Sequence, residues 1–396
     1  MIFNDIVTAN NSPGIGIFVD NSSSMIFEDI VTAVNNKTTD IHINNFSTAT
    51  FNGDVTSGNL YAVNNSTVTF GNGMDDITVS ASIWGDLTSD VLFNGSDGAE
   101  GGSTFVKAIG KNLSGFQRPF REVKFKGTSH DKKIKLGDDV FSEDIYIDNV
   151  TFTPTENITL TSVINTTTHL INPALDLGSK TLAFSGNVVH EGLTQPVTIN
   201  TTFDGGTEEG GHIVLLGSSE IDLTDSSALI INLTDTKGTV LPAADDIRTL
   251  DLFVSDDDNQ LTLKSKADTK INPFTFDGDV NRFIDWTFDP ITGILTGVRN
   301  DEVEEILVEV VNNPNAGNLT PETTEEIINI AMNQGNDAAA EAVERLTNSD
   351  AVALAISPVN LAIQDATQVV SQRAEQVSQP LQFITPVAVA SSDARA

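Results

Sequence analysis

Short runs of alternating apolar and polar residues fill about the first three quarters of the chain, residues 1–300. Examples are residues 41–46 (IHINNF), 66–70 (STVTF), 76–84 (DITVSASIW) and 145–152 (IYIDNVTF). Each run is rich in β-branched residues and is bounded by Asn, Gly or Asp, which is typical of a strand with one buried and one solvated face. The runs follow one another too closely for crossover helices, so the pattern predicts a mainly β architecture.

A near-duplication at the start of the chain indicates that these strands repeat. Residues 1–9 (MIFNDIVTA) and 25–33 (MIFEDIVTA) agree at eight of nine positions, at a spacing of 24 residues. The phrase Phe-x-Gly then recurs at Phe51, Phe93, Phe125, Phe184, Phe203 and Phe276, with a variant at Phe70. From Phe27 the gaps are 24, 19 and 23 residues, and the next gap is 32. Periods of this size are typical of solenoid coils, so we predict a right-handed parallel β-helix (β-solenoid) over residues 1–300.

The residues of this phrase have separate expected roles. We expect each Phe to point inward and to stack on the Phe of the next coil. We expect each Gly to supply the positive φ of a sharp corner. Asn is abundant at the turns, where it tolerates the left-handed region, and we expect Asn side chains to form ladders between neighbouring coils.

The last strand pattern of this region lies in residues 274–300. The segment FIDWTF at 283–288 alternates, and the turn sequence DPITG follows it. We predict a hairpin that carries Trp286 and caps the last coil, because an uncovered edge would pair with other chains.

Residues 301–380 differ in composition from the preceding region. Strand patterns stop, and acidic residues and good helix formers replace them. Thr320 as N-cap and Pro321 at the first position open a helix that Gly335 closes. We interpret the region as a small acidic α-helical linker, which packs on the solenoid end, leads towards a membrane device or is simply solvated. Residues 381–396 are interpreted as an extended tail.

The charge balance excludes some partners. Acidic residues number 55 and basic residues 21, for a formal net charge of −34. Such a surface repels nucleic acids and anionic membranes. Cysteine is absent, which excludes disulfides and thiol nucleophiles and suits a chain that crosses an oxidising compartment unfolded. No apolar run is long enough to span a membrane, and the N-terminus lacks the features of a secretory signal, so we expect any export signal to lie on a segment that this chain lacks.

One segment is basic. Between residues 107 and 135 lie nine basic residues: Lys107, Lys111, Arg118, Arg121, Lys124, Lys126, Lys132, Lys133 and Lys135. One interpretation is an insertion that protrudes from the solenoid and contacts an anionic partner, such as a sulfated glycan or lipopolysaccharide. The other is a basic coil that neutralises its acidic neighbours.

Patterns for catalysis and metal binding are weak. The sequence contains no P-loop, no dinucleotide-binding fingerprint and no HExxH zinc helix. The acidic clusters at residues 75–76, 138–139, 245–246 and 256–258 match neither an EF-hand nor a calcium-binding nonapeptide, so we interpret them as solvated loops. We therefore predict no catalytic residue, no metal site and no cofactor.

A resemblance to a known family depends most on two C-terminal segments. These are RFIDWTFDPITGILTG at 282–297 and NAGNLTPETTEEIINIAMNQGNDAAAEAVERL at 315–346. Together with the Asn/Thr/Gly-rich repeats they resemble the passenger of rickettsial surface-cell-antigen autotransporters of the outer-membrane-protein A and B type. The resemblance implies type V secretion, with a signal peptide, a β-helical passenger at the cell surface or secreted, a helical linker and a C-terminal outer-membrane barrel. It also implies a non-enzymatic surface antigen and virulence factor that adheres to a host-cell protein or glycan.

Two alternatives stay open. A β-helical polysaccharide-active enzyme would need clustered carboxylates and a basic partner on one face of several coils, whereas Asp and Glu here lie mostly in turns. A non-functional fragment of a split autotransporter gene is the other, because the chain lacks both the signal and the barrel that the resemblance implies.

Overall fold

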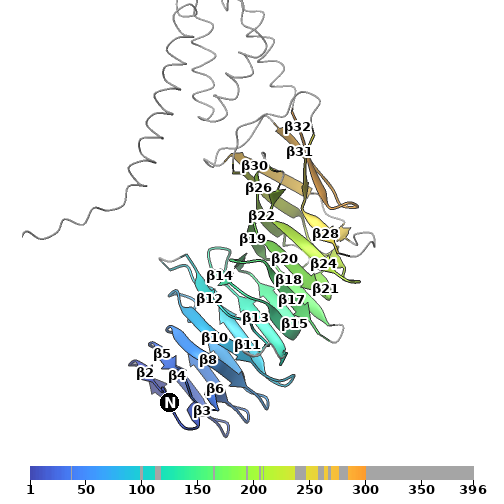
Figure 1. Ribbon diagram of the computed structural model, residues 1–396. Helices are drawn as coiled ribbons and strands as arrows, with labels where there is room; N and C mark the ends of the chain where they lie inside the picture. Colours follow the sequence, from blue (N-terminus) through green and yellow to red (C-terminus); the bar gives the residue numbers. More distant parts are fainter. Residues whose placement is uncertain are drawn as a thin grey trace, which may run out of the picture. The chain divides into compact units, whose positions relative to one another are not determined.

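The computed structural model describes residues 1–299 apart from 37, 99–100, 112–116, 164–165, 193–194, 205–206, 208, 237–246, 257–262, 266–268 and 276–283. The described residues form strands that stack in chain order, from β1 (Ile2–Phe3) to β30 (Thr269–Thr275) (Figure 1). The predicted helices and tail after residue 300 lie outside the described residues.

Parallel pairing arranges the strands in three columns, and each coil of the chain passes through the columns in turn. The first column contains β1, β4 (Ser24–Phe27), β7 (Thr48–Phe51), β9 (Thr67–Phe70), β11 (Asp90–Asn94), β13 (Phe120–Lys126), β15 (Val140–Asp148), β18 (Thr167–Ile171), β21 (Asn187–His190), β25 (Ile221–Leu223) and β29 (Leu263–Ser265). The second contains β2 (Val7–Thr8), β5 (Val31–Ala33), β8 (Val55–Ala62), β10 (Thr78–Trp84), β12 (Ser103–Phe105), β14 (Lys133–Leu136), β16 (Thr151–Pro154), β19 (Ala174–Gly178), β22 (Val197–Asp204), β26 (Leu229–Asp235) and β30.

The third column contains β3 (Ile15–Val19), β6 (Thr39–Ile43), the last residues of β8 and β10, the first residues of β15, then β17 (Ile158–Ser162), β20 (Thr181–Ser185), β24 (His212–Leu216) and β28 (Phe253–Ser255). Single bridges from Ile83 to Ile109 and from Ile109 to Val140 connect its two parts. The predicted parallel β-solenoid is therefore confirmed, with inward side chains from all three columns in one core.

Stacked Phe rings form the centre of the N-terminal coils, as predicted. Phe27, Phe51, Phe70, Phe93 and Phe125 occupy paired positions of the first column and are at most 1% exposed. Successive ring centroids are 4.9, 5.4, 5.3 and 5.2 Å apart. Each such contact contributes roughly 0.5–1.5 kcal/mol beyond the burial of apolar area.

The Phe-x-Gly phrase does not mark one position throughout the solenoid. Phe184 lies in the third column, between Leu160 and Leu215, and Phe203 lies in the second column, paired with Asp235. Phe276 lies outside the described residues. The phrase therefore follows the coils only as far as Phe125.

The predicted role of the glycines is wrong for most of the phrases described. Gly53, Gly95 and Gly127 do not have positive φ. They are glycines because the neighbouring coil is close: a Cβ on Gly53 would lie 2.6 Å from the backbone carbon of Asp29, and one on Gly127 would lie 2.5 Å from the Asn149 oxygen. Positive φ occurs at Gly71 and Gly186.

Asparagine takes most of the positive-φ positions that glycine does not occupy, as the sequence predicts. Eight Asn residues have φ between 46° and 60°: Asn11, Asn21, Asn35, Asn45, Asn64, Asn65, Asn149 and Asn172. An Asn ladder also crosses three coils of the second column, where Asn272 donates to Asn232 and Asn232 donates to Asn200, both at 2.8 Å.

A small antiparallel sheet follows the last coils. It contains β27 (Ile247–Asp251), β32 (Ile294–Arg299) and β31 (Ile284–Asp289), in that order. Trp286 meets the ring of Phe203 edge-on at 5.4 Å. The predicted hairpin range began at residue 274, but residues 274–275 still belong to β30. The third strand of the antiparallel sheet, β27, comes from an earlier part of the chain.

Candidate functional site

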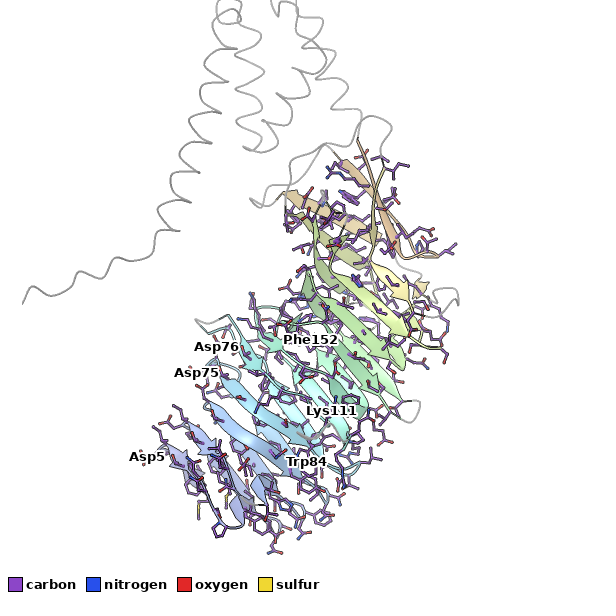
Figure 2. The ribbon with its side chains drawn as sticks, viewed as in Figure 1. Asp5, Asp75, Asp76, Trp84, Lys111 and Phe152 are labelled. Carbon is purple, nitrogen blue, oxygen red and sulfur yellow. The ribbon has the colours of Figure 1, made fainter. Side chains whose placement is uncertain are left out.

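The structure places five of the nine basic residues on two strands, which belong to different columns of the solenoid. Arg121, Lys124 and Lys126 project outward from β13, in alternation with buried Phe and Val side chains. Lys133 and Lys135 belong to β14 in the second column. Lys111, labelled in Figure 2, follows Ile109 and forms an isolated antiparallel bridge with Gln117. Because β13 and β14 are regular strands of the solenoid, most of the described part of this segment belongs to one turn of the solenoid and not to an insertion.

Several of these cations contact neighbouring coils. Arg121 forms an ion pair with Asp90 of the preceding coil, and Lys132 Nζ lies 2.6 Å from Asp97 Oδ1. The hydrogen bond from Lys132 lowers the pKa of Asp97. Lys124 Nζ lies 4.4 Å from the ring centroid of Tyr146 in the next coil. These contacts favour the interpretation in which the basic coil neutralises its acidic neighbours.

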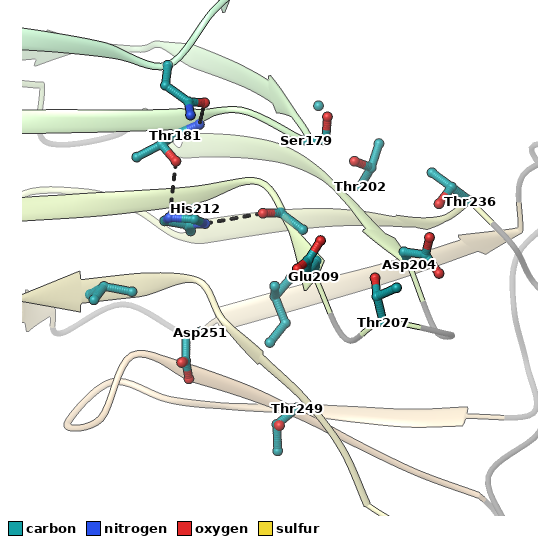
Figure 3. Close-up of a pocket in the computed structure, with 15 residues that line it drawn as sticks. Ser179, Thr181, Thr202, Asp204, Thr207, Glu209, His212, Thr236, Thr249 and Asp251 are labelled. Atoms are coloured by element: carbon teal, nitrogen blue, oxygen red, sulfur yellow. Dashed lines mark hydrogen bonds between the residues drawn. The ribbon is translucent and has the colours of Figure 1, made fainter.

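A cleft of about 1130 Å³ lies near the other end of the solenoid (Figure 3). It is lined by Asn157, Gly178, Ser179, Thr181, Thr202, Asp204, Thr207, Glu209, Gly210, His212, Thr236, Thr249, Leu250, Asp251 and Val254. Most of the lining residues carry hydroxyl, carboxylate or amide groups, whereas pockets for small organic ligands are usually lined by apolar side chains. No sequence pattern indicated this site.

Local hydrogen bonds orient one wall of the cleft. The short strand β23 (Glu209–Gly210) pairs antiparallel with the end of β22. His212 Nδ1 lies 3.2 Å from the Gly210 carbonyl oxygen, which can only accept, so this nitrogen carries the proton. In the neutral ring Nε2 then accepts from the Thr181 hydroxyl at 3.1 Å. The histidine is therefore already engaged at both nitrogens and holds β23 against β20.

The carboxylates of the cleft come from different elements. Asp204 ends β22, Glu209 lies in β23 and Asp251 ends β27 (Figure 3). No lysine or arginine is among the described lining residues. Within the described part of the chain, no group of three or more His, Asp or Glu residues is placed to hold a metal ion.

Two of these carboxylates, Asp204 and Asp251, stand at the ends of strands, and this position was a usable signal. Side chains at equivalent turns of successive coils come together, so acidic turns between residues 157 and 254 could have indicated a shared site. The lining, however, comes from several columns and from β27, which the sequence pattern did not connect with the solenoid.

The fold defines the chain as a parallel β-solenoid with a polar cleft. The chain is similar to outer membrane protein A of Rickettsia rickettsii, with 30% identity over 152 residues, which is 37% of this chain and 6% of that protein. Outer membrane protein A of Rickettsia conorii (strain ATCC VR-613 / Malish 7) shows the same identity over the same length, 7% of that protein. The chain is therefore related to part of a rickettsial outer membrane protein. No family model and no solved structure matches it.

No helix among the described residues is long and apolar enough to cross a membrane.

Proposed function

We propose that this chain is a non-enzymatic segment of a bacterial surface antigen, the passenger of a type V secretion system, that contacts host cells. The similarity to outer membrane protein A carries the proposal. The parallel solenoid supports it, since stacked coils present a long polar surface without needing a catalytic site.

Surface labelling tests the location. Antibodies raised against the folded chain should label intact cells of the source bacterium, and brief protease treatment of those cells should remove the label. An antibody against a cytoplasmic protein is the control for cell integrity. Labelling that appears only after permeabilisation would contradict the proposal.

Although Arg121 and Lys132 are paired with neighbouring carboxylates, Lys126 and Lys133 are exposed, so we propose the basic segment as a contact for an anionic host partner as well. We expect salt-sensitive binding of the chain to heparin or host cells, and weaker binding when Lys132, Lys133 and Lys135 are changed to Glu. A matched control changes Lys180, Lys264 and Lys270 to Glu, which alters the net charge equally. Equal loss in both triple variants would show that net charge, and not this segment, decides binding.

The polysaccharide-active alternative has its best location in the cleft, where carboxylates from three elements line one hollow. Hydrolysis of a glycan panel by the chain, lost on Glu209→Gln and retained by Glu28→Gln, would favour that alternative.

A further inference from the structure

Two edge strands border the cleft. In the antiparallel sheet β27 is an outer strand that pairs with β32, and β23 pairs with β22. Neither has a second neighbouring strand among the described residues. Three residues of β27, Thr249, Leu250 and Asp251, line the cleft, whereas none of the lining belongs to β31 or β32. An edge strand of this kind can pair with an added strand through its backbone.

The two borders are fixed relative to each other at the floor of the cleft. A Cβ on Gly210 would lie 2.9 Å from Leu250 Cδ1 and 2.4 Å from the Thr202 oxygen, so β23 and β27 pack closely there. Leu250 is 3% exposed and belongs to the core. The cleft is therefore a built feature of this end of the solenoid.

The charges of the cleft select its occupant. Glu209 and Asp251 are exposed, and within the described part of the chain no ion pair involves either carboxylate. With no lysine or arginine in the described lining, the cleft attracts cations and repels acidic glycans. Among the described lining residues there is also no Phe, Tyr or Trp, the rings on which a sugar usually stacks.

We propose that this cleft binds an extended, lysine- or arginine-bearing segment of a partner protein, which adds as a strand along β27 and places cationic side chains against Glu209 and Asp251. Hydroxyls of Thr202, Thr207 and Thr249 supply further hydrogen-bond partners for such side chains. This inference names a class of partner for the surface role proposed above. It rests on that role only in assuming that the chain meets the partner at the cell surface.

Peptide binding to the purified full chain tests the proposal. The probe is a fluorescent peptide of alternating Lys and Val, measured by anisotropy at about 150 mM NaCl, with a Glu/Val peptide as the negative probe. We expect the double variant Glu209→Gln/Asp251→Asn to bind the Lys/Val peptide about tenfold more weakly, the effect of losing two charge pairs. The control Asp5→Asn/Glu28→Gln removes two exposed charges near the N-terminus, in coils that do not line the cleft, and should bind like the unaltered protein.

Three results would overturn the proposal. These are no binding of the Lys/Val peptide, equal weakening in the control variant, and undiminished binding of a peptide N-methylated at alternate residues, which cannot pair as a strand. Binding of neutral oligosaccharides that is lost in Glu209→Gln/Asp251→Asn would reassign the cleft to a glycan. All these readouts use purified protein, so they are independent of the surface-labelling result.

Discussion

His190 shows how a single residue can make this solenoid sensitive to pH. Its side chain is 1% exposed, and neither ring nitrogen has a hydrogen-bond partner among the described residues. Burial lowers the pKa of His190 from its ordinary value of 6.5, although the nearby carboxylates of Asp225 and Glu191 act in the opposite direction. Burial also lowers the pKa of His42. Both rings are therefore more easily protonated in the unfolded chain than in the folded one.

Acidification should destabilise the protein, and His190→Leu should reduce this effect. Above about pH 6.5 the ring is neutral in both states, and as pH falls from there towards the lower folded-state pKa only the unfolded chain gains the proton. Each such histidine lowers the free energy of unfolding by at most about 1.4 kcal/mol per pH unit in that window. Urea unfolding between about pH 7.5 and about pH 5 measures the slope. His130→Gln, at a turn, is the control, and an unchanged slope in His190→Leu would contradict the explanation.

Gly53 provides a second prediction at the residue scale. Because a Cβ would lie 2.6 Å from the Asp29 backbone, Gly53→Ala should lower the free energy of unfolding by roughly 1–3 kcal/mol, the usual cost of overpacking. Gly14→Ala is the matched control, since a Cβ there has no atom within 4 Å. Thermal unfolding of both variants checks the prediction. Since Gly→Ala without a clash restricts the unfolded chain and slightly stabilises, a similar loss at both positions would show that close approach is not responsible.

At the scale of the strand, stability comes from identical side chains stacked in register. The parallel pairs keep Phe51 opposite Phe27 and Phe70, so its ring contacts one ring in the preceding coil and one in the next. Outside the core the same register brings Asn side chains and charged pairs together. A substitution at one strand therefore affects two interfaces.

Phe70→Ala should be strongly destabilising. It empties a fully buried position and removes ring contacts with Phe51, Phe93 and Phe105, so the free energy of unfolding should fall by about 3–5 kcal/mol. Phe46→Ala is the control, because that ring is 65% exposed. Denaturant unfolding compares the two, and a loss below about 1 kcal/mol at Phe70 would mean that the stack can close over the gap.

At the scale of the whole molecule, charge opposes the compact state. With 55 acidic and 21 basic residues, like charges repel along the stacked coils, and the ion pairs of the basic coil offset only part of this. Salt screens both effects, but the excess of acidic groups makes repulsion the larger one.

The unfolding midpoint should therefore rise as NaCl increases from about 10 mM to about 500 mM at neutral pH. Thermal unfolding followed by circular dichroism measures the shift. The triple variant Lys132→Glu, Lys133→Glu and Lys135→Glu should show a larger rise, since it adds to the charge excess. A midpoint that falls with salt would show that specific ion pairs outweigh the net repulsion.

The sequence alone determined the solenoid and the stacking of its N-terminal Phe residues, because both depend on local alternation and on a repeat that brings like residues together. Asn at left-handed turns followed from the same local preference. Close approach of coils at Gly53 and Gly127, the separation of the basic residues between β13 and β14, and the joining of β27 to the terminal hairpin were decided by tertiary structure. Each depends on which distant segments meet, and after Phe125 the irregular repeat no longer specifies that register. The cleft between β23 and β27 belongs to this second group, since its walls lie in segments that only the fold brings together.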